Sequence, residues 1–476
     1  MKTANKSVTA TRLVKDALDK AHHFADYNIF TSLCEKEALE KAAAIDAKIQ
    51  NGEKVGRLAG VPFAIKNNFL KKGVEVTASA KILTKFLSPI DATVVEKLEK
   101  EDAILIGSTN LDAFAHGSST ENSYFGPTLN AYDKTRVAGG SSGGSAVAVA
   151  LDIVEFATGS DTGGSIRQPA SFNGIYGLKP TYGAVSRYGV VAMGSSLDSI
   201  GFFTKTPEDM DLLMSICSGR DDKDMMTLPD FYNVNHKTVS QNPYEDFEAS
   251  DTRDDGLARE YKVGTIKDFD NDAIAPEIRQ ALKSKCEELK QKGHEIIELD
   301  MPTLKYALAV YYIIQPAEVA SNLSRYDGIR YGFRSDNSAN LDNLYSSTRA
   351  EGFMPENKRR IMIGNFVLSS GFYDAYFLKA AKARTLIINE FNDAFSKCDF
   401  ILAPVAPNPA FKLGEKVGDP VAMYLEDVMS VTANLAGIPA LAVPAGKTES
   451  GLPIGLQILG PKCSDKSLIE FSKELA

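Results

Sequence analysis

Two short runs of the sequence place serines among clustered glycines, and these runs are where the chain is best equipped for chemistry. Thirteen of the 36 glycines lie between residues 139 and 201, with the densest runs at residues 139–145 and 159–169. Because glycine lacks a side chain, backbone in such runs can approach a ligand closely. A serine hydroxyl held there is a candidate nucleophile for acyl transfer once a base removes its proton.

Other interpretations of the glycine-rich runs fit the residues less well. A phosphate-binding loop needs a lysine that neither run contains, and a dinucleotide-binding loop follows a strand, which residues 132–138 do not resemble. Residues 140–144 match the G-x-S-x-G elbow of serine hydrolases, but that elbow needs a preceding strand and a downstream histidine. Only His236 and His294 follow, both in polar surroundings. Spacing alone leaves a purely structural glycine-rich turn open as an alternative.

A lysine upstream of both runs supplies a candidate base. Lys66 ends a predicted buried strand over residues 61–65 and precedes Ser141 and Ser165, one serine in each run. To accept a proton near neutral pH, the amine must have a pKa of about 7–8 instead of its usual value of about 10.4. Burial among apolar neighbours can lower it that far. We therefore expect Lys66 to be a candidate base for a serine of these runs; the alternative is an ordinary surface lysine at a strand end.

These residues need a scaffold, and the hydrophobic pattern predicts layers of helices and strands. Residues 93–101 have helical periodicity and run into an apolar strand at 103–107. The same alternation recurs in a strand at 263–266, a helix from Pro276 to near Gly293 and a strand at 295–299. Further apolar strands are predicted at residues 400–403, 440–443 and 454–459. Helices closely followed by continuous apolar strands indicate an α/β fold.

We expect one large domain over residues 1–476 with two excursions. Residues 221–260 are polar and irregular, which predicts a solvated surface segment. This segment holds an acidic cluster of Glu245, Asp246, Glu248, Asp251, Asp254 and Asp255. Residues 306–392 are mostly helical in pattern and rich in Tyr and Arg, which predicts an inserted helical cap over the sheet.

Bulk composition narrows the classes of function. The net charge is −9, and the basic residues are scattered, so no basic stripe for direct nucleic-acid binding is present. No run of 18 apolar residues exists, which excludes a membrane-spanning helix. The cysteines form no CxxC pair, which argues for a reducing compartment and against a zinc site. They are Cys34, Cys217, Cys286, Cys398 and Cys463.

The N-terminal segment leaves two compartments open. Residues 1–15 are basic and lack acids, faintly like a mitochondrial transit peptide, but the spacing of Leu13, Ala17, Leu18 and Ala21 favours an amphipathic helix of the folded protein. We therefore expect a bacterial cytoplasmic protein, with the mitochondrial matrix as the alternative.

Taken together, the motifs resemble the amidase signature family, whose catalytic triad is Ser-Ser-Lys. Residues 60–66 (GVPFAIK) resemble its lysine motif, residues 139–144 (GGSSGG) its bridging-serine motif and residues 161–167 (DTGGSIR) its nucleophile motif. The segments GLKPT at 177–181 and GIPA at 437–440 extend the likeness over nearly the whole chain. The resemblance implies a large mixed sheet flanked by helices on both faces.

The resemblance also implies a role for each motif residue. Ser165 forms the acyl-enzyme, Ser141 relays its proton and Lys66 is the base. Backbone N–H groups of Thr162, Gly163, Gly164 and Ser165 are the candidate donors to the developing oxyanion. We interpret Ser142 and Ser145 as structural hydrogen-bonding residues at a helix start, and Arg167 as a buried charge-assisted contact.

Within the family, the sequence is similar to A subunits of glutamyl-tRNA(Gln)/aspartyl-tRNA(Asn) amidotransferases. The phrases that carry this likeness lie at residues 117–127, 195–201, 322–328 and 358–362. It implies glutamine as amide donor, whose α-carboxylate and α-ammonium need a bidentate arginine and an acid. The residues in those positions are Arg360 for the carboxylate, Asp427 for the ammonium and Tyr311 as a pocket wall. If the resemblance to the family is set aside, the preferred interpretation is a helix-surface ion pair for each charged residue and a core aromatic for the tyrosine.

The same likeness implies partners and leaves alternatives. This chain would need no cofactor or metal, while a B subunit would hold tRNA, ATP and Mg²⁺ and a small third subunit would clamp the two. The alternatives are a stand-alone amidase acting on another small amide and a catalytically dead scaffold, the latter disfavoured by the intact triad. Whether the acceptor is Glu-tRNA(Gln) or Asp-tRNA(Asn) is not encoded in this chain.

Three departures from the family pattern stand out. The N-terminus is shorter than usual by about one helix. His116 stands where a methionine is common, beside the expected pocket, and we interpret it as filling space. Asn67 stands where an aspartate is common, which would remove a negative charge near Lys66.

Overall fold

The computed structural model describes residues 1–233, 260–269, 271–337 and 339–475. The acidic cluster predicted within residues 221–260 lies outside these ranges. At the start of that segment, Asp224 and Tyr232 are buried, whereas Asp222 and Met225 are exposed, so residues 221–233 form a surface segment that a few buried side chains hold against the body of the protein.

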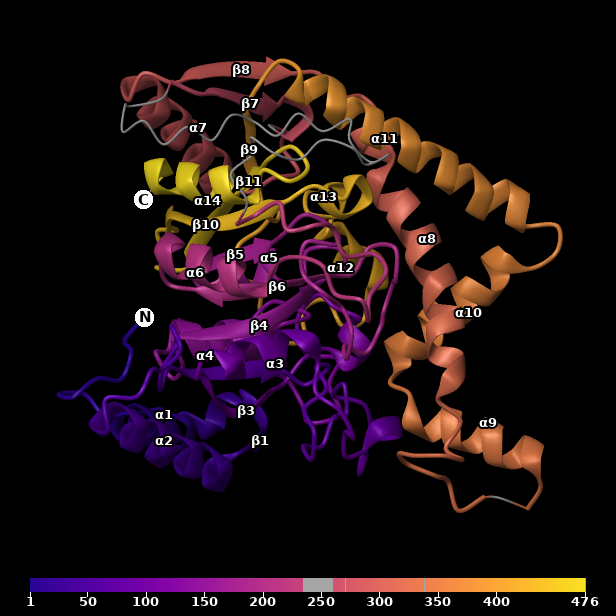
Figure 1. The fold of residues 1–476 in the computed structure, drawn as a ribbon. Helices are drawn as coiled ribbons and strands as arrows, with labels where there is room; N and C mark the ends of the chain where they lie inside the picture. Colours follow the sequence, from indigo (N-terminus) through magenta and orange to yellow (C-terminus); the bar gives the residue numbers. More distant parts are fainter. Residues whose placement is uncertain (234–259, 270, 338, 476) are drawn as a thin grey trace.

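One mixed sheet of eleven strands organises the molecule (Figure 1). Its spatial order is β1-β3-β2-β4-β6-β5-β10-β11-β9-β7-β8. β2 is parallel to β3 and β4, and β7 is parallel to β8 and β9, while the other pairs are antiparallel. The strands are β1 Phe30–Leu33, β2 Pro62–Lys66, β3 Ile104–Thr109, β4 Phe156–Asp161, β5 Tyr176–Lys179, β6 Ser199–Thr204, β7 Lys262–Ile266, β8 Glu295–Leu299, β9 Phe400–Pro404, β10 Ala440–Lys447 and β11 Pro453–Leu459.

Helices cover both faces of this sheet, which confirms the predicted α/β fold. Strand β2 shows why: Phe63 and Ile65 belong to one apolar core, whereas Ala64, between them, belongs to another. The helices are α1 Ala10–His23, α2 Glu35–Gln50, α3 Thr93–Lys100, α4 Gly143–Ala150, α5 Arg167–Phe172, α6 Pro207–Cys217, α7 Pro276–Gln291, α8 Ala307–Asn322, α9 Leu341–Gly352, α10 Pro355–Leu368, α11 Lys379–Phe395, α12 Pro420–Leu425, α13 Val431–Ala436 and α14 Asp465–Phe471.

The region from residue 306 to 392 forms α8–α11, which stand along one side of the sheet (Figure 1). Helix α8 packs against α10, α11 and α13 and so joins this group to the sheet. At the other end of the sheet, α1 buries Val14, Ala17, Leu18 and Ala21 and packs against α2 and β3, as its amphipathic spacing predicts. In the described ranges, no helix is both long and apolar enough to cross a membrane.

Candidate active site

Lys66 ends β2, which lies inside the sheet between β3 and β4, and its side chain is fully buried. Its Nζ donates to Ser141 Oγ at 2.8 Å and to Ser160 Oγ at 2.9 Å, and lies 3.3 Å from the Ser160 carbonyl oxygen. Asn68 Nδ2 also donates to Ser160 Oγ at 3.1 Å. These contacts orient the amine toward the first glycine-rich run.

Burial lowers the pKa of Lys66 to about 7, against the opposing effect of the carboxylates of Asp112, Asp161 and Asp198. Removing an ammonium from water disfavours its charged form. A substantial fraction of the amine is therefore neutral near pH 7 and able to accept a proton.

The loop that carries Ser141 is fixed from both sides. Gly140 N–H donates to Gln168 Oε1 at 3.0 Å, and the Ser141 carbonyl accepts from Asp112 N–H at 3.2 Å. A Cβ on Gly140 would lie 2.1 Å from Asp112 Oδ2, so only glycine permits this approach. Asp112 is itself buried and held by the N–H groups of Thr120 and Asn122. This acid positions the loop, a role that was not predicted for it.

Ser165 lies on the second glycine-rich run, directly after β4, and is half-buried. The two runs are joined where Ser142 N–H donates to the Ser165 carbonyl at 3.2 Å. Among the described residues, the Ser165 hydroxyl forms no hydrogen bond, so the expected bond to Ser141 is not made in this structure. The structure thus brings Lys66 and Ser141 into direct contact and leaves the Ser165 hydroxyl without a partner in the same region. Catalytic hydrogen bonds are often long without substrate and tighten when it binds.

The backbone before Ser165 corrects the predicted set of oxyanion donors. Gly164 N–H donates to Asp161 Oδ1 at 2.9 Å and is therefore already occupied. In the described part of the chain, the N–H groups of Thr162, Gly163 and Ser165 form no hydrogen bond, which keeps them available. A Cβ on Gly163 would lie 2.6 Å from the Tyr311 hydroxyl, so the Tyr311 ring lies directly on this turn.

Arg167 makes the buried charge-assisted contact expected for it. Its guanidinium forms a two-point ion pair with Asp161 at 3.0 and 3.1 Å and also donates to Gln457 and Asn434, each at 2.7 Å. Although burial opposes it, the Arg167 charge holds the pKa of Asp161 well below its usual range. Asp161 in turn accepts from the N–H groups of Gly164 and Ile166, which fixes the turn around Ser165.

The two neighbouring serines differ from each other. Ser142 occupies the N-cap position of α4, where its side chain caps no backbone N–H group and its Oγ donates to the Ser160 carbonyl at 3.3 Å. Ser145 shares a hydrogen bond of 2.7 Å with Thr109 Oγ1, which ties α4 to β3. Both are structural contacts, as predicted.

Arg360 on α10 is buried, with 1% of its surface exposed, so it is no surface ion pair. Its Nε donates to Glu356 Oε1 at 2.6 Å and its Nη1 to Gln315 Oε1 at 2.8 Å. The guanidinium carbon lies 4.6 Å from the ring centres of both Tyr312 and Tyr424. A cation held by aromatic faces and one carboxylate is well placed to bind a planar anion.

Asp427 follows α12 and is buried beside Arg360. Its two oxygens accept from Ser118 Oγ and Tyr312 Oη, each at 2.7 Å. Burial raises the pKa of this carboxyl to about 6, while these hydrogen bonds and the Arg360 charge lower it. Helices α8, α10 and the segment after α12 thus bring Tyr311, Arg360 and Asp427 to one side of the turn that carries Ser165, which we call the nucleophile turn after its predicted role.

Two of the family departures have different surroundings from those expected. Asn67 Oδ1 accepts from the N–H and hydroxyl of Thr77, and its Nδ2 donates to the Glu75 carbonyl. Its side chain therefore belongs to the following loop and leaves the charge balance of Lys66 to other residues. His116 Nδ1 lies 3.0 Å from Asn357 Nδ2, one helical turn before Arg360, while its Nε2 is buried without a partner.

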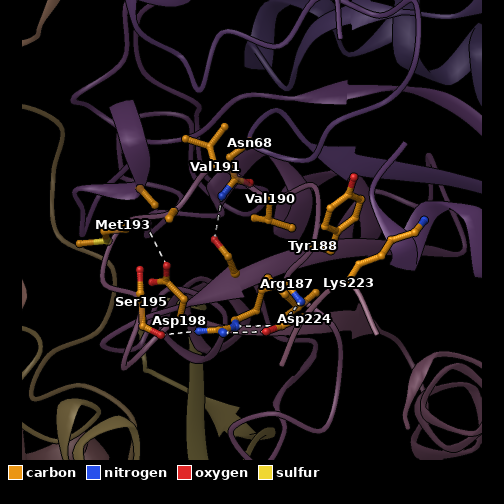
Figure 2. A pocket seen from close by; sticks show the side chains of 14 residues that line it. Asn68, Arg187, Tyr188, Val190, Val191, Met193, Ser195, Asp198, Lys223 and Asp224 are labelled. Carbon is orange, nitrogen blue, oxygen red and sulfur yellow. Dashed lines mark hydrogen bonds and ion pairs between the residues drawn. The ribbon is translucent and has the colours of Figure 1, made fainter. Parts of the chain in front are cut away.

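A cavity of about 220 Å³ adjoins the Ser160 side of the lysine. Figure 2 shows Asn68, Asp198 and the Arg187–Asp224 ion pair around it. Asp198 also accepts from Thr162 Oγ1 at 2.6 Å, which links the cavity wall to the nucleophile turn. Ser160, Asn68 and Asp198 support the site but were not predicted. The sequence signal that could have identified Ser160 and Asp198 is their position inside the glycine-rich region.

Comparison with known proteins extends this picture. Residues 12–469 match the family model described as Amidase. The chain is 48% identical over 450 residues to the glutamyl-tRNA(Gln) amidotransferase A subunit numbered 2 of Clostridium acetobutylicum, covering 94% of this chain and 91% of that protein. It is 47% identical to the corresponding A subunit of Heliobacterium modesticaldum, over 98% of this chain and 93% of that protein.

Comparison with a crystal structure leads to the same family. The crystal structure of the A subunit of glutamyl-tRNA(Gln) amidotransferase from Thermotoga maritima superposes with a TM-score of 0.76 at 37% identity, covering 97% of this chain and 90% of that one. The match to the family model and the identity to these relatives each extend over most of the sequence. The chain therefore belongs to the amidase family.

Proposed function

We propose that the chain hydrolyses glutamine and releases ammonia for a tRNA-dependent amidotransferase. The observation that carries this proposal is the buried Lys66 amine, 2.8 Å from Ser141 Oγ, beneath the turn that presents Ser165. The names of the relatives, all A subunits of glutamyl-tRNA(Gln) amidotransferase, support the choice of glutamine and of the larger reaction. They favour it over a stand-alone amidase acting on another amide.

In the first step, Ser165 Oγ attacks the side-chain carbonyl carbon of glutamine. Its proton passes to Ser141 as Ser141 gives its own proton to the neutral Lys66 amine, so one C–O bond forms and the amine becomes an ammonium. The carbonyl electron pair moves to oxygen, where the N–H groups of Thr162, Gly163 and Ser165 stabilise it. Loss of one such donor typically costs about 2.7–4 kcal/mol.

The intermediate then collapses. The carbonyl re-forms, the C–N bond breaks, and the proton held by Lys66 returns through Ser141 to the leaving nitrogen, which departs as ammonia. Ser165 is left as a γ-glutamyl ester. A water molecule then uses the same relay: its proton passes to Lys66, its oxygen bonds to the carbonyl carbon, the ester bond breaks, and Ser165 regains the proton from Lys66 as glutamate leaves.

Recognition of the free amino acid falls to the helical side of the site. Arg360 binds the α-carboxylate, the Asp427 carboxylate binds the α-ammonium, and Tyr311 forms the wall next to Gly163. The surroundings of Arg360 support this assignment, because its guanidinium is buried against two aromatic rings with a single carboxylate partner, Glu356.

Within the complex, this chain works with other subunits. A B subunit binds tRNA, ATP and Mg²⁺ and amidates misacylated Glu-tRNA(Gln) or Asp-tRNA(Asn), and a small third subunit clamps the two chains. This chain requires no metal or cofactor for hydrolysis and acts in the bacterial cytoplasm. The designation of the relatives as A subunits supports a multi-subunit assembly.

Substitution of the triad tests the catalytic assignment. Lys66→Ala, Ser141→Ala and Ser165→Ala are each expected to lower glutamine hydrolysis by about 10⁴-fold or more, because the three residues act as one relay. Amidation supplied with free ammonia should survive in the assembled complex. Ser346→Ala, the same change at an exposed serine of α9, is the matched control. Glutaminase activity retained in Ser165→Ala would eliminate the assignment.

A second experiment tests the assembly. Purification of the native protein under mild conditions should recover a second, tRNA-binding subunit. Recovery of the chain alone, fully active on amides other than glutamine, would select the stand-alone amidase.

A further inference from the structure

Two buried side-chain nitrogens beside Arg360 lack hydrogen-bond partners. His116 Nε2 and Gln315 Nε2 are both enclosed by protein, and each residue has 0% of its surface exposed. Leaving a buried donor or acceptor unpaired is unfavourable, so each such group calls for a partner supplied from elsewhere. Their common neighbour is Arg360, which the proposed function places at the substrate α-carboxylate.

The surrounding hydrogen bonds decide what these nitrogens can do. Gln315 Oε1 accepts from Arg360 Nη1 at 2.8 Å, and because a guanidinium only donates, the amide orientation is fixed with Nε2 as a free donor. Asn357 Oδ1 accepts from Met354 N–H, so the Asn357 nitrogen is the atom 3.0 Å from His116 Nδ1. His116 Nδ1 also lies 3.2 Å from the Ala113 carbonyl oxygen, so Nδ1 accepts from Asn357 in one tautomer of the neutral ring and donates to Ala113 in the other, and Nε2 carries the proton only in the first.

The position of Gln315 places its donor between two parts of the site. Its Cγ and the Thr162 methyl both lie within 4 Å of the point where a side chain on Gly194 would begin. Gln315 thus extends from Arg360 toward the turn that carries Ser165. His116 Nδ1 lies 3.0 Å from Asn357 Nδ2, and Asn357 lies three residues before Arg360 on the same face of α10.

Gln315 Nε2 is a donor, and His116 Nε2 is a donor in the tautomer whose Nδ1 accepts from Asn357. Arg360 already shares its charge with Glu356 and, among the described residues, its Nη2 forms no hydrogen bond. A ligand suited to these groups offers several acceptor oxygens and needs more donors than one partly neutralised guanidinium provides. A carboxylate satisfies both conditions.

We propose that His116, in the tautomer with its proton on Nε2, and Gln315 Nε2 join Arg360 in binding the α-carboxylate of the amide donor, and thereby select substrates with a free α-carboxylate. This inference rests on the proposed function, because it concerns the same amino-acid substrate. It assigns a binding role to His116 that space filling does not include.

The test compares L-glutamine with L-glutaminamide, which carries a neutral amide in place of the α-carboxylate. The full chain, with any subunits that accompany it, is assayed as wild type, Gln315→Glu and His116→Met. Gln315→Glu keeps the oxygen that accepts from Arg360 but sets an acceptor against the substrate carboxylate. In each variant, the ratio of kcat/KM for L-glutamine to that for L-glutaminamide should fall about tenfold or more, mainly through KM. His116→Gln, which keeps a donor near Nε2, should restore most of the ratio lost in His116→Met.

The controls separate this role from a structural one. Gln280→Glu on α7 and His23→Met on α1 make the same changes at exposed positions and should leave the ratio as in wild type. Equal losses on both substrates, or ratios within about twofold of wild type in both site variants, would overturn the inference while wild-type glutaminase activity upholds the proposed function. If one variant fails to fold, the other decides. A wild-type protein that hydrolyses other amides but not L-glutamine would defeat the proposed function itself.

Discussion

At the scale of single residues, the central feature is the Lys66 amine, which forms no ion pair with a carboxylate among the described residues. The acids nearest in effect to Lys66 are all bound elsewhere: Asp112 by backbone N–H groups, Asp161 by Arg167, and Asp198 by Thr162 and backbone N–H groups. An ion pair with any of them would hold the lysine as an ammonium. Hydrogen bonds to serine hydroxyls orient the amine without holding it in its charged form, which cannot act as a base.

This arrangement predicts the pH dependence of hydrolysis. Only the neutral amine is a base, so with a pKa of about 7 for Lys66, kcat/KM for glutamine should rise with pH and reach half of its plateau near pH 7. The Asp427 carboxyl, with a pKa of about 6, must be ionised to bind an ammonium, so KM should fall as pH rises from about 5 to 7. A rate profile taken from pH 5 to 9, with the enzyme returned to pH 8 to verify its stability, measures both. A profile flat from pH 6 to 8 would contradict the role of Lys66.

A contact in the site could be predicted from the sequence where a local motif places each of its two residues. The lysine and the bridging serine meet as expected because both follow from a strand end and a glycine-rich turn. Whether Gly164 N–H was free could not be predicted, because its acceptor, Asp161, is oriented by Arg167, whose other partners lie 267 and 290 positions away in the sequence. The contacts of Asn67 could not be predicted for a similar reason: adjacency to Lys66 in sequence does not make its side chain a neighbour, since successive side chains leave a strand in opposite directions.

At the scale of elements, the crossing of α8 and α10 positions the residues to which the proposed function assigns substrate recognition. Tyr311 and Gln315 lie on α8, and Arg360 lies on α10. The helices meet closely at Gly364, where a Cβ would lie 1.9 Å from the Pro316 carbonyl oxygen. Since Pro316 interrupts the α8 hydrogen-bond pattern and Gly364 has no side chain, this pair of residues permits the approach.

Gly364→Ala is therefore expected to push α10 away from α8 and to displace Arg360 from Gln315. We expect kcat/KM for glutamine to fall about tenfold, mainly through KM, and the free energy of unfolding to fall by about 1–3 kcal/mol. Steady-state kinetics and urea denaturation measure these effects. Gly418→Ala, at a glycine with no atom within 4 Å of an added Cβ, is the control. An unchanged KM in a destabilised Gly364→Ala variant would refute the link between this crossing and binding.

Seven of the eleven strands were predicted from the sequence, whereas β1, β4, β5 and β6 were not. Strands β3, β7, β8, β9, β10 and β11 lie within a few residues of their predicted positions, because continuous apolar runs identify them. Strand β4, with the sequence FATGSD, was not predicted as a strand. Its glycine and polar residues have low strand propensity, and it forms because β2 and β6 pair with it on both sides.

At the scale of the whole molecule, the sheet consists of two contiguous halves. Strands β1–β6 occupy one half and β7–β11 the other, and they meet where β5 pairs with β10 (Figure 1). Arg167 lies at this seam and connects Asp161 in the first half with Asn434 and Gln457 in the second. One buried guanidinium therefore links the nucleophile turn to both halves of the protein.

Arg167→Met should lower the free energy of unfolding by about 3–5 kcal/mol, because it leaves the Asp161 carboxylate buried without its ion-pair partner. Hydrolysis should also decline, since Asp161 fixes the turn around Ser165. Urea denaturation followed by circular dichroism measures the stability. Arg12→Met, at a side chain that is 74% exposed, should change it by less than about 0.5 kcal/mol. A stability loss below about 1 kcal/mol in Arg167→Met would show that the seam is held by other contacts.

The division of the sheet into early and late halves also has a consequence for biosynthesis. The ribosome makes Lys66, Ser141 and Ser165 within the first half, whereas Arg360 and Asp427 emerge only near the end of translation. A truncated nascent chain would carry the nucleophile and its base but none of the groups assigned to grip a free amino acid.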